Sequence, residues 1–513
     1  MKPLRLSVLL LSFTAVLPPM VDAAARPDPA RPSTAPSTAA PAAPIRFAAP
    51  RLVAVGDGPV FVVPADFDRD GRLDLAVVNV LSGDVSILIG DGTGGVAPAA
   101  STAVGDTPSA AAAADFDGDH DLDLAVIGTG SANVAVLLGD GLGGFAAPHV
   151  FLAGEAPVAL AAAELDGDGV ADLIVASLST DRVAVMQGNG AGGFGAPRSF
   201  ATGDGPVAVV VGDFSGDGRP DLVTANALSD DIAILRAEAG GFVAARRYGA
   251  GDRPTWAAAA DFNGDGRRDL AVSNAFANSV AVLDGDGVGR FGLPRHQPVG
   301  QSPAMVAAAD LNGDGAVDLA SADRFSNTLS LLAGDGTGGF ATAAALPIGP
   351  SPNALAAGDF DGDGAADLAV VLFDADAVAI LLNRSADRDG DGVADGDDNC
   401  PDRANADQRD GDRDGPGDAC DNCPPLANGD QADADGNGTG DACDALDQYL
   451  AGSAAWREIE TVIADIQERL LLLVAADGRQ EAHLEALDRD LRRLRERLAE
   501  IEAIPSIRNQ LKK

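Results

Sequence analysis

The chain has 513 residues, a formal net charge of −41 and a hydrophobic content of 46%. This length predicts more than one module, and the hydrophobic content excludes a wholly disordered chain. Lysine occurs only at Lys2, Lys512 and Lys513. Nucleic acid and anionic membranes both require a basic face, so we expect neither as a partner and expect divalent cations instead.

Residues 1–25 are predicted to be a signal peptide. Lys2 and Arg5 precede an apolar stretch from Leu6 to Leu17, and the alanines at 23–25 offer a cleavage site. A spanning helix needs about 20 apolar residues, so cleavage is favoured over an uncleaved membrane anchor. No later segment is long and apolar enough to span a membrane, and residues 26–44 predict a Pro/Ala-rich disordered linker. We therefore expect a secreted or cell-surface protein.

A nine-residue acidic pattern, Asp-x-Asp-x-Asp-Gly-x-x-Asp with substitutions, occurs seven times within residues 45–384. Successive copies begin 48 or 49 residues apart. An interval of this size, with several short strands per unit, is typical of propeller blades. We therefore predict an all-β, seven-bladed β-propeller. A parallel β-helix would require the copies to follow one another every nine residues, and they do not.

Each unit predicts four strands. In the unit that opens with Phe194-Gly195-Ala196-Pro197, the second strand runs from Pro206 to Phe214, and the third and fourth cover 222–225 and 232–235. The second strands are alanine-rich, as in Ala110–Ala114, but these runs are short and lie between turn signals, so strand is favoured over helix. Small side chains of this kind would fit the crowded centre of a ring.

Arg46–Val55 is predicted to close the ring. Phe47-Ala48-Ala49-Pro50 matches the Phe-x-x-Pro that follows Gly-Gly in later units, yet it precedes the first acidic loop. The last unit, Asp359 to Leu382, ends where its next strand should begin. The N-terminal segment should therefore supply the missing strand of the last blade.

The acidic loops are candidate calcium sites. Calcium takes six to eight oxygen ligands, and positions one, three, five and nine carry side-chain oxygens, with glycine at position six for a sharp turn. His120 replaces that glycine in copy two, and Ser215 removes one charge from copy four, which we expect to bind most weakly. Aspartates and glycines can also be plain turn formers, but seven copies in register favour metal.

The expected ligands in the propeller are Asp66, Asp68, Asp70, Asp74, Asp115, Asp117, Asp119, Asp123, Glu164, Asp166, Asp168, Asp172, Asp213, Ser215, Asp217, Asp221, Asp261, Asn263, Asp265, Asp269, Asp310, Asn312, Asp314, Asp318, Asp359, Asp361, Asp363 and Asp367. With Phe194-Gly195-Ala196-Pro197, these repeats resemble the FG-GAP or VCBS repeat family, whose blades are shared with integrin α chains. The resemblance implies a seven-bladed propeller with calcium in its hairpin loops, in proteins often used for adhesion or ligand binding.

Residues 385–444 form a second acidic module. It opens with Asp387-x-Asp389-x-Asp391-Gly392 and contains two related halves offset by 23 residues. It resembles thrombospondin type 3 repeats, which implies a chain wrapped around calcium ions with few regular elements. The expected ligands are Asp387, Asp389, Asp391, Asp395, Asp398, Asn405, Asp407, Asp410, Asp412, Asp414, Asp418, Asn428, Asp430, Asp433, Asp435, Asn437 and Asp441. Dockerin-like modules would need flanking apolar helices, where this chain has Pro, Gly and Asn.

All four cysteines lie in this module and allow three pairings. The duplication, the 20-residue intervals and the export signal favour Cys400 with Cys420 and Cys423 with Cys443. A zinc site or a redox Cys420-x-x-Cys423 pair is the alternative. Beyond them, residues 445–513 carry leucine and isoleucine at heptad spacing, interrupted near Asp477-Gly478, which predicts a helical hairpin or an oligomeric coiled coil.

No catalytic set stands out, because the four histidines are scattered, and we expect a protein that is not an enzyme. The favoured function is a secreted or cell-surface calcium-dependent binding or adhesion protein, with an extracellular protein or a glycan as ligand. Phe276 and Phe325 are candidate contact residues, although packing between blades would also explain them. The alternatives are an extracellular carbohydrate-active enzyme or lectin on the same ring, and a structural envelope component.

Overall fold

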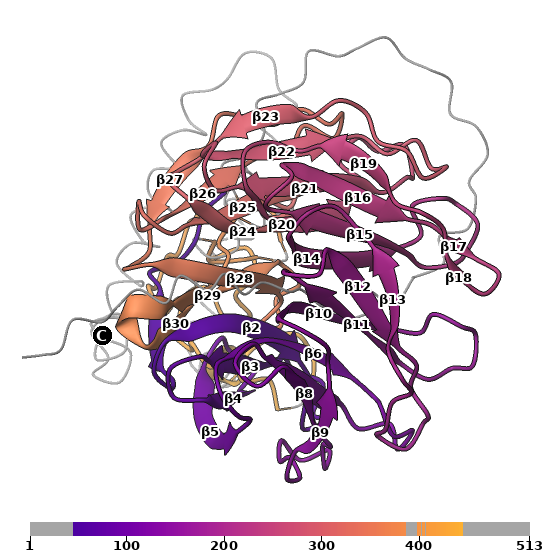
Figure 1. The fold of residues 1–513 in the computed structure, drawn as a ribbon. Helices are drawn as coiled ribbons and strands as arrows, with labels where there is room; N and C mark the ends of the chain where they lie inside the picture. Colours follow the sequence, from indigo (N-terminus) through magenta and orange to yellow (C-terminus); the bar gives the residue numbers. More distant parts are fainter. Residues whose placement is uncertain (1–44, 386–397, 402, 406, 435, 445–513) are drawn as a thin grey trace, which may run out of the picture. The chain divides into compact units, whose positions relative to one another are not determined.

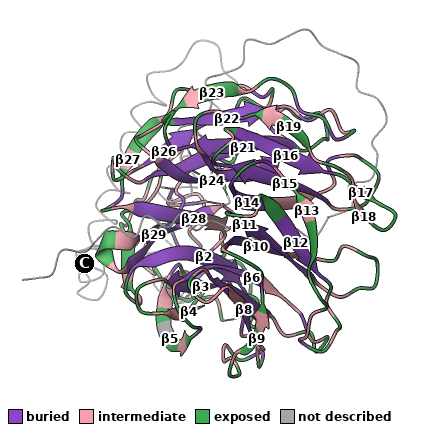
Figure 2. Cartoon of the chain, viewed as in Figure 1, coloured by how far each residue is buried: buried purple, intermediate pink, exposed green. Residues whose placement is uncertain are grey.

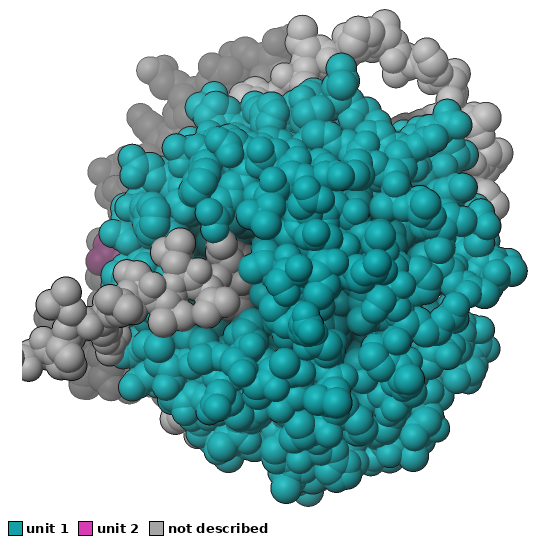
Figure 3. Space-filling view, in the orientation of Figure 1, with its two compact units in different colours: residues 1–386 teal, residues 387–513 magenta. Residues whose placement is uncertain are grey.

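The computed structural model describes residues 45–385, 398–401, 403–405, 407–434 and 436–444. The chain divides into two compact units, residues 1–386 and 387–513 (Figure 3). The predicted signal peptide, linker and C-terminal helices lie outside the described residues. Within the described part of the chain, no helix has the length and hydropathy needed to cross a membrane.

The first unit is a ring of seven four-stranded antiparallel sheets (Figure 1). The innermost strands contact one another in the order β2, β6, β10, β14, β20, β24 and β28, and β28 returns to β2. A closed ring of radial sheets is a β-propeller. The prediction of an all-β, seven-bladed propeller is therefore confirmed.

From the centre outward, the blades are β2 (Pro59–Ala65), β3 (Asp74–Asn79), β4 (Asp84–Gly90), β5 (Val96–Ala103); β6 (Pro108–Ala114), β7 (Asp123–Gly128), β8 (Asn133–Leu137), β9 (His149–Leu152); β10 (Pro157–Ala163), β11 (Asp172–Ser177), β12 (Arg182–Met186), β13 (Arg198–Ala201); β14 (Pro206–Gly212), β15 (Asp221–Asn226), β16 (Asp231–Leu235), β19 (Arg246–Gly249); β20 (Pro254–Ala260), β21 (Asp269–Asn274), β22 (Ser279–Leu283), β23 (Arg295–Pro298); β24 (Pro303–Ala309), β25 (Asp318–Asp323), β26 (Thr328–Leu332), β27 (Ala344–Pro347); and β28 (Pro352–Gly358), β29 (Asp367–Leu372), β30 (Ala377–Leu381), β1 (Arg51–Ala54). A small hairpin, β17 (Ala237–Glu238) with β18 (Gly241–Phe242), extends the fourth blade, and a 3₁₀ turn, η1 (Phe373–Ala375), precedes β30.

The ring closes with the N-terminal strand. β1 pairs antiparallel with β30, with Arg51 opposite Ile380 and Ala54 opposite Ala377. The preceding residues continue the pairing, since Ala48 N donates to Leu382 O at 2.8 Å. The closure predicted for Arg46–Val55 is therefore confirmed.

The core lies between the blades, where the sheets pack face to face (Figure 2). Counted from the centre of the ring, the second strand of every blade, such as β3 and β29, is buried along its whole length. After their first aspartate these strands are mainly apolar because both of their faces are covered, and the polar residues within them, such as Thr224 and Asp323, are buried too. The alanine-rich runs form the innermost strands, as predicted, for example β6.

Two opposite ends of the ring carry different loops. Each acidic loop joins an innermost strand to the second strand of its blade, as residues 66–73 join β2 to β3. We call this end the acidic face. The turns between second and third strands, such as residues 80–83, lie at the other end because neighbouring strands are antiparallel. We call that end the hairpin face.

The described part of the second unit has little regular structure and two disulfides. Cys400 is bonded to Cys420 and Cys423 to Cys443, which confirms the predicted pairing. The duplication also extends to hydrogen bonds. Asn399 N donates to Gln408 Oε1 at 2.8 Å, and the equivalent bond 23 residues later joins Asn422 N to Gln431 Oε1 at the same distance.

Candidate metal centres

The first acidic residue of each loop, aspartate in six copies and Glu164 in the third, accepts backbone N–H groups of the turn that follows. Asp66 Oδ2 accepts the N–H of Gly71 at 2.9 Å, and its Oδ1 accepts the N–H of Asp70 at 3.2 Å. Position six has a positive φ, +85° at Gly71 and +73° at His120. Only glycine adopts this conformation without strain, so His120 occupies the unfavourable backbone position that the sequence predicts for copy two.

Four of the seven loops bring three carboxylates together. In each of these loops, one oxygen from each of three acidic residues lies within 4.8 Å of the others. The triads are Asp66, Asp68 and Asp70; Asp115, Asp117 and Asp123; Glu164, Asp166 and Asp168; and Asp359, Asp361 and Asp367. Converging carboxylate oxygens are the donor set that calcium prefers, so these residues fit the ion.

The other three loops differ at position three. This position holds Ser215, Asn263 or Asn312 instead of a carboxylate. In the described residues of these loops, no three acidic oxygens come together at the same spacing. The sequence predicts that copy four has one carboxylate fewer than the complete copies. Copies five and six also have one carboxylate fewer, although their asparagines still offer an oxygen ligand.

Position nine is built differently from positions one, three and five. Asp74 is fully buried at the start of β3, and it accepts the N–H of Phe67 at Oδ2 and that of Gly90 at Oδ1, each at 2.8 Å. Both amides are thereby satisfied, and the loop is held against the end of β4. The same two bonds recur at Asp123, Asp172, Asp221, Asp269, Asp318 and Asp367.

Burial raises the pKa of these position-nine carboxyls in the metal-free chain. The pKa is about 6 at Asp123, Asp172, Asp269 and Asp318, and about 7 at Asp367. The main cause is desolvation, opposed by the two amide hydrogen bonds. A bound cation would favour the ionised form, and each oxygen keeps a second lone pair for it.

In the seventh loop, one carboxylate oxygen has no protein donor. Asp361 Oδ1 is enclosed without a hydrogen bond, while its Oδ2 lies 3.4 Å from Arg384 Nη1. A buried oxygen without a donor costs free energy unless something else binds it. This arrangement suits a metal ligand.

The second unit holds a fifth carboxylate triad, Asp410, Asp412 and Asp414. Neither oxygen of Asp412 has a donor of normal hydrogen-bond geometry, and Asp414 Oδ1 also lacks one. Burial, together with the neighbouring carboxylate of Asp414, raises the pKa of Asp412 to about 6. Three close carboxylates, two of which have unpaired oxygens, fit a divalent cation better than they fit a plain turn.

Other predicted ligands in this unit have partners within the protein. Asn405 donates to the Asn399 side chain, and the side-chain amides of Asn428 and Asn422 are in contact, each pair at 2.6 Å. Asp418 accepts the N–H of Gly411 at 2.7 Å and pairs with Arg409 at 2.9 Å. Asp433 Oδ2 accepts the N–H of Gly438 at 2.9 Å. Asp387, Asp389, Asp391, Asp395 and Asp435 lie outside the described residues.

The hairpin face carries exposed apolar side chains. Leu228, Phe276 and Phe325 occupy equivalent turns of three adjacent blades and are 70%, 62% and 65% exposed. The Arg253 guanidinium lies 4.7 Å from the centre of the Phe276 ring. Packing between blades therefore does not explain these phenylalanines, since most of their surface remains accessible.

Sequence reasoning missed the structural role of position nine. The available signal was its place directly before a continuous apolar strand, as in Asp74-Leu75-Ala76-Val77-Val78. A strand buried on both faces also buries the residue at its start. The carboxylate there must find donors within the protein.

Comparison with known proteins supports the repeat assignment. A family model described as an FG-GAP-like repeat matches residues 66–126, 115–175, 165–224, 216–272, 261–321 and 310–370, which together span more than half of the chain. The search of curated proteins gave no match.

Several solved propellers are similar in fold. The structure of BBS1N in complex with ARL6DN is 15% identical, with a TM-score of 0.49, covering 66% of this chain and 96% of that one. An Agrocybe aegerita lectin is 18% identical, with a TM-score of 0.41, covering 62% and 86%. The Pseudomonas aeruginosa periplasmic gluconolactonase is 20% identical, with a TM-score of 0.42, covering 56% and 85%. Likenesses of this size carry no argument about function.

Proposed function

Because this chain belongs to the FG-GAP-like repeat family, we propose that it is an exported calcium-binding protein whose propeller presents a ligand-binding or adhesion face. Calcium ions hold the acidic loops, and the hairpin face contacts an extracellular protein or a glycan without turnover. The thrombospondin type 3-like module, residues 385–444, acts as a calcium-stiffened stalk. The C-terminal segment attaches or oligomerises the protein.

The observation that carries ligand binding is the exposure of Phe276 and Phe325 at equivalent turns of neighbouring blades. Large aromatic side chains are usually covered in a protein without a partner, and contiguous exposed ones mark interaction surfaces. Leu228 extends the same row to a third blade. Arginine beside aromatic residues is a common composition at the centre of protein interfaces.

The observation that supports calcium is the convergence of carboxylate oxygens in four propeller loops and in the Asp410–Asp414 segment. The residues would supply oxygen ligands, and the ion would neutralise mutual repulsion and rigidify each loop. Extracellular calcium is millimolar, so even sites of about 10⁻⁴ M affinity would be occupied. Two disulfides in the second unit are consistent with an oxidising compartment.

The experiment is a screen of the full-length protein against extracellular proteins and glycans, in calcium and in chelator. A double variant, Phe276→Ser with Phe325→Ser, should lose the captured ligand by at least about tenfold. Leu152→Ser, which removes an exposed side chain from outer strand β9, is the matched control and should bind normally. Unchanged binding by the double variant would contradict the assigned face, and turnover of a polysaccharide would overturn the non-enzymatic assignment.

A further inference from the structure

The centre of the ring holds an apolar cavity of about 590 Å³. Its walls are the innermost strands, which contribute mostly alanine, valine and leucine side chains. This volume lies within the range of small-molecule sites, which are typically apolar with a few polar groups at defined places. The cavity is separate from the row of side chains on the hairpin face.

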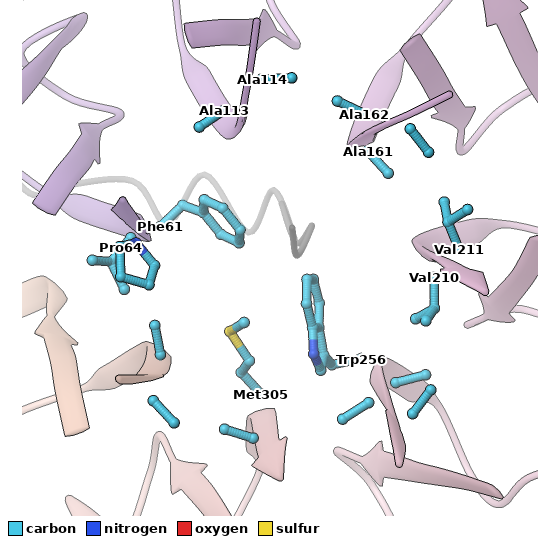
Figure 4. Close-up of a pocket in the computed structure, with 18 of the residues that line it drawn as sticks. Phe61, Pro64, Ala113, Ala114, Ala161, Ala162, Val210, Val211, Trp256 and Met305 are labelled. Carbon is cyan, nitrogen blue, oxygen red and sulfur yellow. The ribbon is translucent and has the colours of Figure 1, made fainter. Parts of the chain in front are cut away.

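Three large side chains form the floor of the cavity. Phe61, Trp256 and Met305 are the third residues of β2, β20 and β24, and they point into the centre of the ring (Figure 4). The Phe61 and Trp256 ring centroids are 6.1 Å apart, although the strands belong to different blades. The other four blades have alanine at this position: Ala110, Ala159, Ala208 and Ala354.

The cavity opens toward the acidic face. The first four residues of all seven innermost strands are buried. Beyond them, six of the seven strands become partly accessible, β2 being the exception, and the last three residues of β14, β24 and β28 are partly exposed. The floor therefore closes the channel on the hairpin side, while the mouth lies at the acidic loops.

The mouth is negatively charged. Asp115 and Glu164 line it, and none of the described lining residues is basic. Arg268 is a basic residue near this end of the ring, where it lies beside Gly212 at the end of β14. The seven nine-residue loop copies together contain five arginines and 26 acidic residues, so negative charge dominates. One calcium ion in every loop would still leave this rim with a net negative charge.

From the floor, the walls and the rim, we infer that the cavity binds an apolar molecule that carries a single cationic group. The apolar part would displace water from the alanine walls and contact Trp256. The cation would remain at the mouth beside Asp115 and Glu164. Burial of apolar surface contributes affinity, and the carboxylates favour a cation over an anion of the same shape.

Trp256 is a built-in reporter for this site. The chain has two tryptophans, so the full-length Trp456→Phe variant leaves Trp256 as the only one. The probes are decylammonium, decanol and decanoate, which share one tail, each added below its aggregation concentration. We expect a saturable change in Trp256 emission with decylammonium, at least about tenfold tighter than with decanoate. No saturable change, or equally tight decanoate binding, would overturn the inference.

Two cavity-filling variants test the location. Ala307→Phe in β24 and Ala258→Leu in β20 both add volume to the cavity wall and should abolish the response. Ala345→Phe, on exposed outer strand β27, is the control and should respond normally. Melting curves identify which of the two cavity-filling variants fold. If Ala307→Phe does not fold, Ala258→Leu, which adds less volume, provides the test. A folded cavity-filling variant whose Trp256 emission still changes with decylammonium would overturn the site.

The Phe276 and Phe325 variants should respond to decylammonium as the parent protein does, which separates this test from that of the proposed function.

Discussion

Phe67, in the first acidic loop, packs edge-on against Phe145 of the second blade, with 5.5 Å between ring centroids. Beside this contact, Gly143 N donates to Phe67 O at 3.1 Å. Equivalent ring pairs join Phe116 to Phe194, Phe214 to Phe291 and Phe262 to Phe340. Four of the seven acidic loops are thus points of contact between blades, so order in these loops supports the ring.

Phe67→Ala should therefore lower the free energy of unfolding by about 3–5 kcal/mol, because it removes a buried aromatic side chain and leaves a cavity. Urea unfolding of the full-length protein in calcium measures the change. Phe325→Ala is the matched control: its side chain is exposed, so we expect a change within about 0.5 kcal/mol. Equal effects for the two variants would contradict the role of the contact between blades.

Deleting residues 46–55 should sharply lower the melting temperature, because the seventh blade would lose its outermost strand. The backbone groups of β30 that pair with β1 would then be left without partners. The measurement is a thermal melt of the deleted and intact chains. Leu52→Ser, an exposed position on β1, should melt nearly as the wild type does. An unchanged melt after the deletion would refute the closure.

Positions one and nine of a loop should respond differently to substitution. Asparagine keeps only one of the two acceptor oxygens, so Asp74→Asn leaves one of two buried amides without an acceptor, and we expect the free energy of unfolding to fall by about 1–3 kcal/mol with or without calcium. Asp66→Asn also removes a charge and one acceptor, but the amides of Asp70 and Gly71 that Asp66 accepts are exposed and can bond to water instead. Its stability loss should appear in calcium and be much smaller in chelator. The two variants are compared by urea unfolding under both conditions, and equal behaviour would show that position nine has no separate structural role.

Stability of the metal-free protein should fall as pH rises from about 4 to about 7. Burial raises the pKa of all seven position-nine carboxyls above 3.8, the unfolded value, and five of them have folded pKa values of about 6 to 7, for example Asp318 and Asp367. A raised folded pKa stabilises the fold below the unfolded value, and this contribution is lost as pH passes through the folded value. Calcium binds the ionised form, so the stabilisation by calcium should grow over the same interval.

Urea unfolding near pH 5 and near pH 8, with metal-free and calcium-loaded protein, checks this sign. If the free energy of unfolding of the metal-free protein rose from pH 5 to pH 8, the raised pKa values assigned to the position-nine carboxyls would be contradicted.

Much of the fold was predictable because the repeat is strict. The spacing of copies from Asp66 to Asp359 predicts the blade number, and the early Phe47-Ala48-Ala49-Pro50 predicts the closure. The disulfide pairing followed from the duplicated spacing of Cys400 and Cys423. These features are local in sequence or repeat along it.

The cavity and the inner carboxylates could not be read in the same way. Phe61, Trp256 and Met305 lie in three blades, and only the closed ring brings them together. Asp74 resembles Asp66 in type and pattern, but the packing of β3 buries it while Asp66 remains near the surface. Burial depends on the neighbouring blades, which a single nine-residue motif does not reveal.

The most direct test of the central claim is thermal unfolding of the full-length Trp456→Phe protein in excess calcium and in chelator, followed through Trp256 emission. Trp256 is buried in the propeller, so the signal reports the melting of the ring. If the acidic loops are structural calcium sites, calcium should raise the melting temperature strongly, and Asp66→Asn combined with Asp70→Asn should reduce that rise. Identical melting curves in calcium and chelator would contradict the account and leave the propeller aspartates as turn formers.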